Sequence, residues 1–491
     1  MQTATKAAAR SNPRFAIIGA GMSGILTAIT LKNRGLTNFT VYEKAAKLGG
    51  TWRDNTYPGL ACDVPSIVYA YSFELKPDWT RHFSPGGEIQ NYFEHVARKY
   101  DVERFIRFDS EMDLAEYRDG KWHLRTKDGH TDVVDFVISA TGVLHHPAYP
   151  KIDGLESFAG PCFHTARWDH SHSLDGKRVG IVGTGSTAIQ IVPAIVDQVA
   201  KVSLFQRTAQ WVLGMPNPAF SEDEKRMFAE KPDFLRQSYL HLGKRFIDGF
   251  SRAVIGDHEE LQRIEDACRE NLESNVSDPE LRRKLTPDYK VACKRLIVSD
   301  AFYPAIQKPN AELVTEAIER IEPNGVRTKD GRLHELDILV LATGFDAHAF
   351  MRPMRIVGRN GITLEQAWAD SVQAYRSVSM PGFPNFFMLV GPNSPVGNFP
   401  LIMISELQLN YVLQLVDLVL EGRATEVAPS FAATERFNAA VREAMKGTVW
   451  MSGCRSWYLD KNGNAALWPW TFERFQQEMK APDLRDFDLV A

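Results

Sequence analysis

Residues 15–24, FAIIGAGMSG, pass from a short apolar run directly into three glycines, and residues 25–31, ILTAITL, continue with the pattern of a buried helix. A strand, a tight turn and a helix in this order begin a βαβ unit. A second apolar run, residues 39–42, ends at Glu43 and completes the unit. The chain therefore opens with a Rossmann-like α/β fold.

The three glycines of this segment, Gly19, Gly21 and Gly24, have the spacing GxGxxG. The motif is weak by itself, but here it follows a strand and opens a helix. Glu43 lies 19 positions after Gly24, where a carboxylate can accept hydrogen bonds from a ribose. Because glycines let the backbone approach a pyrophosphate at the helix N-terminus, we predict a dinucleotide site that also includes Ser23. The alternative is a glycine turn that serves packing alone.

The same pattern recurs at residues 177–190, KRVGIVGTGSTAIQ, with the motif Gly183-x-Gly185-x-x-Ala188. The same offset of 19 positions from Ala188 reaches Arg207 in place of an acid. A guanidinium there can form charge-assisted hydrogen bonds with the 2′-phosphate of NADP, whereas a carboxylate would repel it. We therefore predict FAD in the first fold and NADPH in the second. The alternative is that Arg207 is a solvated surface charge.

Two further apolar runs, within residues 135–142 and 336–344, end in the same triplet, Ala-Thr-Gly. Since the second glycine motif lies between them, we predict that the second dinucleotide fold is inserted in the first. Residues 221–284 are charged and have helical spacing of apolar side chains, which favours a helical insertion. We thus predict an α/β protein with two Rossmann-like dinucleotide-binding domains. The expected segments are 1–150 (FAD domain, first part), 151–215 (NADP domain, first part), 216–290 (helical insertion), 291–345 (NADP domain, second part) and 346–491 (FAD domain, C-terminal part).

The composition argues against several classes of protein. The 491 residues include 57 basic and 61 acidic side chains, whereas a nucleic-acid-binding protein needs a basic excess, so no nucleic-acid partner is expected. No apolar run reaches the ~18 residues that a membrane span requires. The first fifteen residues lack the apolar core of a signal peptide and are expected to form a short mobile tail. We predict a cytoplasmic protein without stable membrane insertion.

The five cysteines, Cys62, Cys162, Cys268, Cys293 and Cys454, are widely separated. They show no disulfide framework and no CxxC pair, so we expect no metal site and a reducing compartment. Disulfide reductases also contain two dinucleotide folds, but they need a nearby dithiol, and Cys268 and Cys293 are 25 residues apart. We interpret these two cysteines as small buried hydrophobic residues.

The segment FAGPCFHTARWD, between the two glycine motifs, reads Phe158-x-Gly160-x-x-x-His164-x-x-x-Trp168-Asp169. It resembles the fingerprint of Baeyer-Villiger monooxygenases. The related flavin-containing monooxygenases typically carry Tyr at the position of Trp168, so this residue favours the branch that oxidises ketones.

A second stretch, residues 49–63, GGTWRDNTYPGLACD, is similar to a longer pattern of the same family. The resemblance implies a class B flavoprotein monooxygenase that uses FAD, NADPH and O2. Such an enzyme inserts one oxygen atom next to a ketone carbonyl and forms an ester or lactone through a C4a-peroxyflavin. Sulfoxidation of a sulfide is implied as a side activity. The particular ketone and the oligomeric state remain open.

The resemblance also implies roles for individual residues. Arg295 matches the family's active-site arginine beside the flavin, and Asp63 matches the acid that orients it. Lys294 matches a basic residue that joins Arg207 at the 2′-phosphate, although a Lys-Arg pair is by itself typical of a solvated face. The fingerprint, with His164, is expected to couple the two nucleotide domains and not to supply a general base. The further implied cofactor contacts are Gly50, Thr51, Trp52, Asp63, Gly183, Gly185, Ser186, Thr187, Thr208 and Asn393.

Two other functions remain open at this point. A heteroatom monooxygenase acting on amines or sulfides shares every cofactor motif but needs no cation beside a peroxide anion. A non-catalytic dinucleotide-sensing protein would bind FAD or NADP without consuming oxygen. Finally, the aromatic residues between 457 and 470 are interpreted as core packing, with a wall of the substrate pocket as the alternative.

Overall fold

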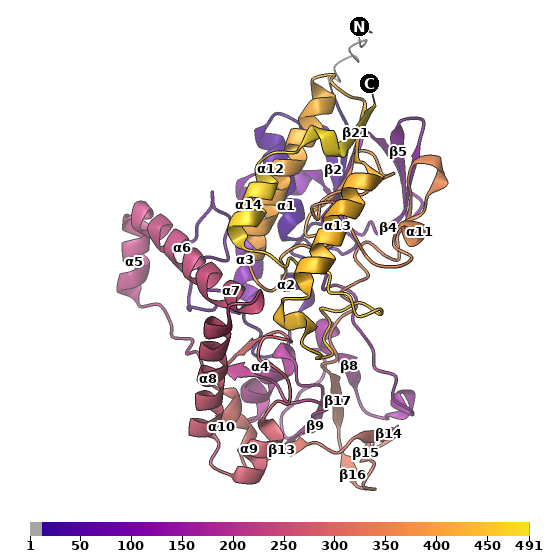
Figure 1. Cartoon of the computed structure of the whole chain (residues 1–491). Coiled ribbons are helices and arrows are strands. Elements are labelled where there is room, and N and C mark those ends of the chain that lie inside the picture. Colours follow the sequence, from indigo (N-terminus) through magenta and orange to yellow (C-terminus); the bar gives the residue numbers. More distant parts are fainter. Residues whose placement is uncertain (1–11, 491) are drawn as a thin grey trace.

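The computed structural model describes residues 12–490 and arranges them around two parallel five-stranded sheets (Figure 1). The first sheet, with the long C-terminal helices beside it, occupies the upper part of this view, and the second sheet occupies the lower part. Most of the predicted N-terminal tail, residues 1–11, lies outside the described residues.

The first sheet has the strand order β19-β7-β1-β2-β3, and all neighbouring strands are parallel. Its central strand β1 is fully apolar and at most 6% exposed at any residue, as expected for a strand covered on both faces. Helix α1 (Met22–Asn33) follows β1 directly after the glycine turn. The strands are β1 (Phe15–Ile18), β2 (Phe39–Tyr42), β3 (Ile106–Arg107), β7 (Phe136–Ser139) and β19 (Phe386–Met388).

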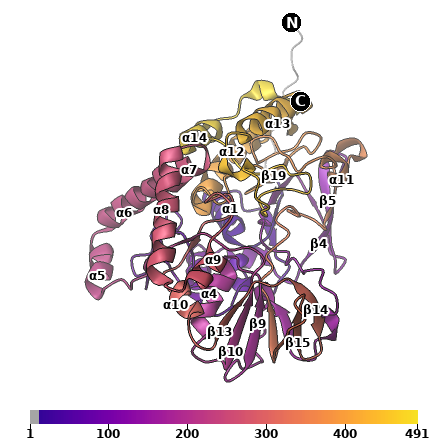
Figure 2. The same cartoon turned by 60° about the horizontal axis from the view of Figure 1, so that its bottom comes forward.

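The second sheet has the order β13-β10-β9-β17-β8 and is also parallel (Figure 2). Helix α4 (Ser186–Ile195) follows β9 as α1 follows β1. Because all five strands come from the chain between β7 and β19, the second fold is inserted in the first, and the predicted fold class is confirmed. The strands are β8 (Cys162–His164), β9 (Arg178–Val182), β10 (Lys201–Phe205), β13 (Ala311–Val314) and β17 (Ile338–Leu341).

The two Ala-Thr-Gly triplets occupy equivalent positions beside the two glycine turns. The triplet after β7 begins at Ala140, and a Cβ on Gly19 would lie 2.7 Å from the Ala140 carbonyl oxygen. The triplet after β17 begins at Ala342, and a Cβ on Gly183 would lie 2.4 Å from the Ala342 carbonyl oxygen. Gly19 and Gly183 also have φ values of +103° and +110°. Both positions therefore require glycine.

The predicted helical insertion is present as five helices on one side of the molecule (Figures 1 and 2). A π-helical turn, Ile247–Ser251, follows α6 directly, and the Ser251 hydroxyl donates to the Asn398 carbonyl oxygen. Single π turns inside helices are frequent near functional sites. The helices are α5 (Glu222–Glu230), α6 (Pro232–Phe246), α7 (Arg252–Val254), α8 (His258–Asn275) and α9 (Pro279–Leu285).

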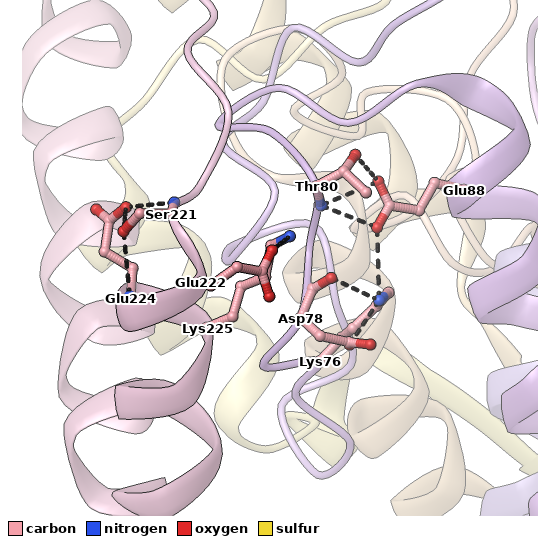
Figure 3. A network of polar contacts seen from close by, with 8 residues as sticks. All are labelled: Lys76, Asp78, Thr80, Glu88, Ser221, Glu222, Glu224 and Lys225. Atoms are coloured by element: carbon pink, nitrogen blue, oxygen red, sulfur yellow. Dashed lines mark hydrogen bonds and ion pairs between the residues drawn. The ribbon is translucent and has the colours of Figure 1, made fainter.

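Polar contacts define where the insertion begins (Figure 3). Ser221 caps α5: its hydroxyl accepts from the Glu224 N–H at 3.2 Å, and the Glu224 carboxylate accepts from the Ser221 N–H at 2.7 Å. On the facing loop, Lys76 forms ion pairs with Asp78 at 2.6 Å and Glu88 at 3.4 Å. The reciprocal cap between Ser221 and Glu224 ends the preceding extended segment and starts α5 at a fixed residue.

Helix α12 (Leu401–Leu420) is long and apolar enough to cross a membrane by length and composition. It is also the core helix of the first domain: 67% of its most apolar window is buried, and it packs against α1 and α14 (Phe472–Lys480). Burial inside the protein explains its apolar composition.

The remaining elements complete the two domains. Two of the smaller sheets, β18-β4-β5-β6 and β20-β21, belong to the chain around the first domain. Their bounds, with those of the other strands and helices, are α2 (Thr51–Asp54), α3 (Gly86–Lys99), β4 (Met112–Arg118), β5 (Lys121–Thr126), β6 (Thr131–Val134), β11 (Val212–Leu213), β12 (Ile297–Val298), α10 (Phe302–Ile306), β14 (Ile318–Glu322), β15 (Gly325–Thr328), β16 (Leu333–Glu335), β18 (Arg355–Val357), α11 (Leu364–Ala367), β20 (Glu426–Pro429), α13 (Phe431–Met445) and β21 (Phe487–Val490).

The structure corrects one interpretation of the cysteines. Cys293 and Cys454 form a disulfide although 161 residues separate them. Spacing along the chain could not show this pair, because the C-terminal segment meets residue 293 only after folding. Cys268 is free and buried, as expected. The prediction of a reducing compartment, which rested on the cysteine pattern, loses that support.

Candidate active site

A cavity of about 480 Å³ lies between the two glycine turns, within the usual range of ~300–1,000 Å³ for ligand pockets. Its walls come from both Rossmann-like folds, from the loop after α2 and from the C-terminal segment. The predicted site residues that line it are Gly19, Gly21, Ser23, Glu43, Gly50, Thr51, Trp52, Asp63, Gly185, Ser186, Thr187 and Arg295.

The first glycine turn brings the N-terminus of α1 to this cavity. A Cβ on Gly24 would lie 1.8 Å from the Gly19 carbonyl oxygen, so the turn closes tightly only with glycine there. The Glu43 carboxylate, at the end of β2, accepts from the Ala20 N–H at 2.8 Å and pairs with Arg53 at 2.9 Å. The turn thus presents backbone N–H groups and the helix dipole, next to a fixed carboxylate, as a pyrophosphate and its ribose require.

The second glycine turn presents α4 to the same cavity through Gly185, Ser186 and Thr187. Arg207 is exposed two residues after β10, and Lys294 lies over the ring of Tyr289 at 4.5 Å. Burial and the positive charge of Arg207 lower the pKa of Lys294. Within residues 12–490, neither cation forms an ion pair with an acidic side chain. Asp288 is near enough to act on Lys294 without forming an ion pair, and two neighbouring cations of this kind form a suitable site for a phosphate.

Arg295 and Asp63 form the ion pair that the resemblance implies. Arg295 Nη2 donates to Asp63 Oδ1 at 2.7 Å and to Oδ2 at 2.6 Å, and Nε donates to Oδ2 at 2.9 Å. Burial alone would lower the pKa of Arg295, but the charge of Asp63, its hydrogen bonds and the nearby Tyr458 and Cys62 together raise that pKa. The Arg295 side chain keeps 31% of its surface exposed at the cavity. A permanent cation is therefore fixed in the cavity wall.

The fingerprint residues lie on and around β8, the edge strand of the second sheet, and do not line the cavity. His164 ends β8, is 1% exposed, and accepts from the Ala166 N–H through Nδ1 at 3.1 Å. Burial lowers the pKa of His164, and the accepting role of Nδ1 also favours the neutral imidazole. Its ring contacts Phe345, and Phe345 does line the cavity.

The other fingerprint residues pack or cap in the same region. Phe158 is buried in the core of the second domain, and a Cβ on Gly160 would lie 2.4 Å from the Asp337 carbonyl oxygen. Trp168 packs edge-on against Phe163 at 5.1 Å, and Asp169 accepts from the Ser171 N–H at 2.9 Å. This region connects the second sheet to the cavity wall without offering a reactive group.

Several predicted cofactor residues lie beside the cavity and not in its wall. Gly24 and Gly183 support the two turns from behind, and the Thr208 carbonyl oxygen accepts from the Thr184 hydroxyl at 2.7 Å. Asn393 is buried, its amide donates to the Leu467 carbonyl oxygen at 3.4 Å, and its FAD contact stays a prediction.

Sequence reasoning missed part of the cavity. Trp468 is fully buried in the core, as the packing interpretation expects, whereas Trp457 lines the cavity; a contact of Trp457 with substrate stays a prediction. His145 also lines the cavity, and burial lowers its pKa to about 4. Its Nε2 donates to the Phe350 carbonyl oxygen at 2.8 Å. No motif or periodicity distinguishes these residues in the sequence.

Comparison with known proteins identifies the family of this chain. A flavin-binding monooxygenase-like family model matches residues 12–222. An uncharacterized monooxygenase of Mycobacterium tuberculosis is 47% identical over 477 residues, covering 97% of this chain and 96% of the relative. A Baeyer-Villiger monooxygenase of Streptomyces coelicolor is 40% identical over 484 residues, covering 97% of this chain and 92% of the relative. The chain belongs to the Baeyer-Villiger monooxygenase family.

Solved structures of the family share the whole fold. A crystal structure of cyclohexanone monooxygenase from Rhodococcus sp. Phi1 bound to NADP+ has a TM-score of 0.87 at 27% identity, covering 98% of this chain and 99% of that one. An oxidized steroid monooxygenase bound to NADP also has a TM-score of 0.87 at 27% identity, covering 97% of this chain and 99% of that one. The family inferred from the two fingerprints is thereby confirmed.

Proposed function

We propose that this protein is an NADPH- and O2-dependent flavin monooxygenase that converts a ketone to an ester or lactone. The overall reaction consumes one ketone, one O2, one NADPH and one proton, and gives one ester, one NADP+ and one water. One oxygen atom enters the bond between the carbonyl carbon and its neighbour. The observation that carries the proposal is the Arg295–Asp63 pair in a cavity wall between two dinucleotide folds.

The residues around the cavity fit both cofactors. The first glycine turn and Glu43 would hold the pyrophosphate and a ribose of FAD, because the close backbone approach and the carboxylate suit those groups. The second turn, with Arg207 and Lys294, would hold NADPH through its 2′-phosphate. When bound, these cofactors supply hydride transfer and the activation of dioxygen.

Arg295 would stabilise negative charge on oxygen at the reacting centre. Its charge is permanent and Asp63 fixes its orientation, so little reorganisation is needed when charge develops. The cavity wall also contains apolar side chains, which would exclude water around a bound substrate and strengthen the interaction. The apolar side chains there are Phe246, Met351, Phe399, Leu401 and Trp457.

The substrate class and the location are finer parts of the proposal. We propose a small ketone as substrate, with a sulfide as a side substrate, because the cavity offers apolar side chains and the Arg295 cation held by Asp63. We keep the proposal of a cytoplasmic enzyme and of the five domain segments. The inserted second sheet supports the order of these segments.

A substrate panel tests the proposed reaction. The purified protein, loaded with FAD and supplied with NADPH, is given linear, cyclic and aryl ketones, an amine and a sulfide, and the products are identified by mass spectrometry. We expect esters or lactones from at least one ketone class. N-oxides or sulfoxides without any ester would instead identify a heteroatom monooxygenase. NADPH and O2 consumption that never exceeds a protein-free control would indicate a non-catalytic binding protein.

A further inference from the structure

Asp63 contacts one edge of the Arg295 guanidinium, and the opposite edge faces the loop around Gly397. The Asp63 carboxylate accepts from Nε and Nη2, as described above. Arg295 Nη1 lies 3.5 Å from the point at which a Cβ would stand on Gly397. Gly397 itself has a φ of +94° and lines the cavity.

The Tyr458 hydroxyl is the polar group on this second side. It lies 2.8 Å from the same point above Gly397, so the hydroxyl and Arg295 Nη1 converge on one small volume. The Tyr458 side chain is 3% exposed. Burial raises the pKa of Tyr458, while the charge of Arg295 and a hydrogen bond with it act in the opposite direction. The protonated phenol can accept a hydrogen bond from the guanidinium through its oxygen.

The ring of Tyr458 is held by its neighbours. It packs against Trp457 at 4.3 Å and edge-on against Trp450 at 6.0 Å. The Trp457 carbonyl oxygen accepts a hydrogen bond from His348 at 3.0 Å. The hydroxyl therefore has a fixed place beside Arg295, and removal of the hydroxyl alone would leave this packing intact.

A covalent link joins the two segments that carry these residues. Cys293 precedes Arg295 by two residues, Cys454 precedes Tyr458 by four, and the two cysteines form the disulfide. The C-terminal segment thus cannot move away from Arg295 without taking the segment of Cys293 with it. The arrangement places Arg295 between Asp63 on one side and a tethered phenol on the other.

We propose that Tyr458 is a positioning residue for Arg295, because its hydroxyl holds the guanidinium edge that Asp63 leaves free. This inference rests on the proposed role of Arg295 as the active-site cation. Asp63 orients the guanidinium through Nε and Nη2, and a contact at Nη1 would restrict its plane further. Gly397 is part of the arrangement, since a side chain there would displace the hydroxyl.

The test compares Tyr458→Phe with Tyr411→Phe. Tyr411 is also buried beside an arginine, with Arg376 at 5.8 Å from its ring, but neither residue lines the cavity. In Tyr458→Phe we expect kcat for ester formation to fall about tenfold, as for the loss of a hydrogen bond to a charged group, with little change in KM. The share of NADPH consumed without ester should rise. Tyr411→Phe should leave both quantities unchanged.

Three further measurements separate positioning from a general structural role. FAD content and the thermal midpoint of Tyr458→Phe should equal those of the wild type. In an Arg295→Ala background, Tyr458→Phe should have no additional effect on rate, because the residue that it positions is gone. A crystal structure of Tyr458→Phe should show the Arg295 guanidinium displaced or in two orientations.

The outcomes distinguish this inference from the proposed function. If the wild type makes ester and Tyr458→Phe makes it at the same rate and coupling, the positioning role is wrong although the enzyme class stands. Additive losses in the double variant would also overturn it. If the wild type makes no ester from any ketone, the proposed function fails. In that case the crystal structure of Tyr458→Phe still tests the positioning role. An unmoved Arg295 guanidinium would reject this role, and a displaced one would support it.

Discussion

The two glycine turns share one backbone geometry but differ in the side chains around them. In both, the first glycine has a positive φ and packs against the carbonyl oxygen of an Ala-Thr-Gly triplet. In the first fold the next strand ends in Glu43, which is 3% exposed and bonded to the turn. In the second fold Gln206 occupies the matching position after β10, and the next residue, Arg207, is exposed and lies near Lys294. The shared backbone can bind a pyrophosphate, and one side chain selects the ribose or its phosphate.

The comparison also indicates that the residues of the reacting centre lie outside the two glycine turns. Neither turn contributes a side chain that can stabilise a negative oxygen at the reacting centre. The Arg295–Asp63 pair lies between the folds and joins the loop after α2 to the segment before β12. We therefore expect substitutions of Arg295 or Asp63 to lower kcat. Substitution of Arg207, beside the second turn, should lower the preference for NADPH over NADH.

The largest effect is expected from Arg295→Ala. Loss of one fixed charge from a water-excluded site typically costs on the order of 10² to 10³ in rate. FAD content should stay near that of the wild type, because the first glycine turn is untouched. Product formation and flavin absorbance of the purified variant measure both. An unchanged rate of ester formation would show that the cation has been assigned to the wrong residue.

Arg207→Ala should change cofactor preference and little else. A lost charge-assisted contact to the 2′-phosphate is worth about 1.5–3 kcal/mol, or roughly ten- to a hundredfold in the KM for NADPH. The KM for NADH should be nearly constant. Lys201→Ala is the matched control, since Lys201 begins β10, the strand that precedes Arg207, and pairs with Glu312 at 2.6 Å. Equal losses for NADPH and NADH in Arg207→Ala would contradict the comparison of the two turns.

Asp63→Asn should give a smaller loss than Arg295→Ala. The cation remains, but it loses the carboxylate that orients it and raises its pKa. We expect kcat to fall about tenfold, as for one weakened hydrogen bond to a charged group. Steady-state kinetics with NADPH and a ketone provide the measurement. A loss equal to that of Arg295→Ala would mean that Asp63 acts directly on the substrate or cofactor.

Sequence alone predicted the features of the molecule that residues close together in the chain determine. The glycine turns, the carboxylate and guanidinium at equal offsets, and the family fingerprints are each contained in a short segment. The Arg295–Asp63 pair came from the resemblance and not from spacing. The cavity contact of Trp457, the position of Tyr458 and the Cys293–Cys454 disulfide could not be predicted, because folding brings their partners across more than a hundred residues.

Oxygen-isotope labelling shows whether an oxygen atom of O2 enters the ketone. The purified enzyme converts a ketone with NADPH under ¹⁸O2 in ordinary water, and mass spectrometry locates the label in the product. We expect an ester or lactone that carries one ¹⁸O atom, at the oxygen between the former carbonyl carbon and its neighbour. An ester without label, or an unmodified ketone beside labelled water and hydrogen peroxide, would contradict it.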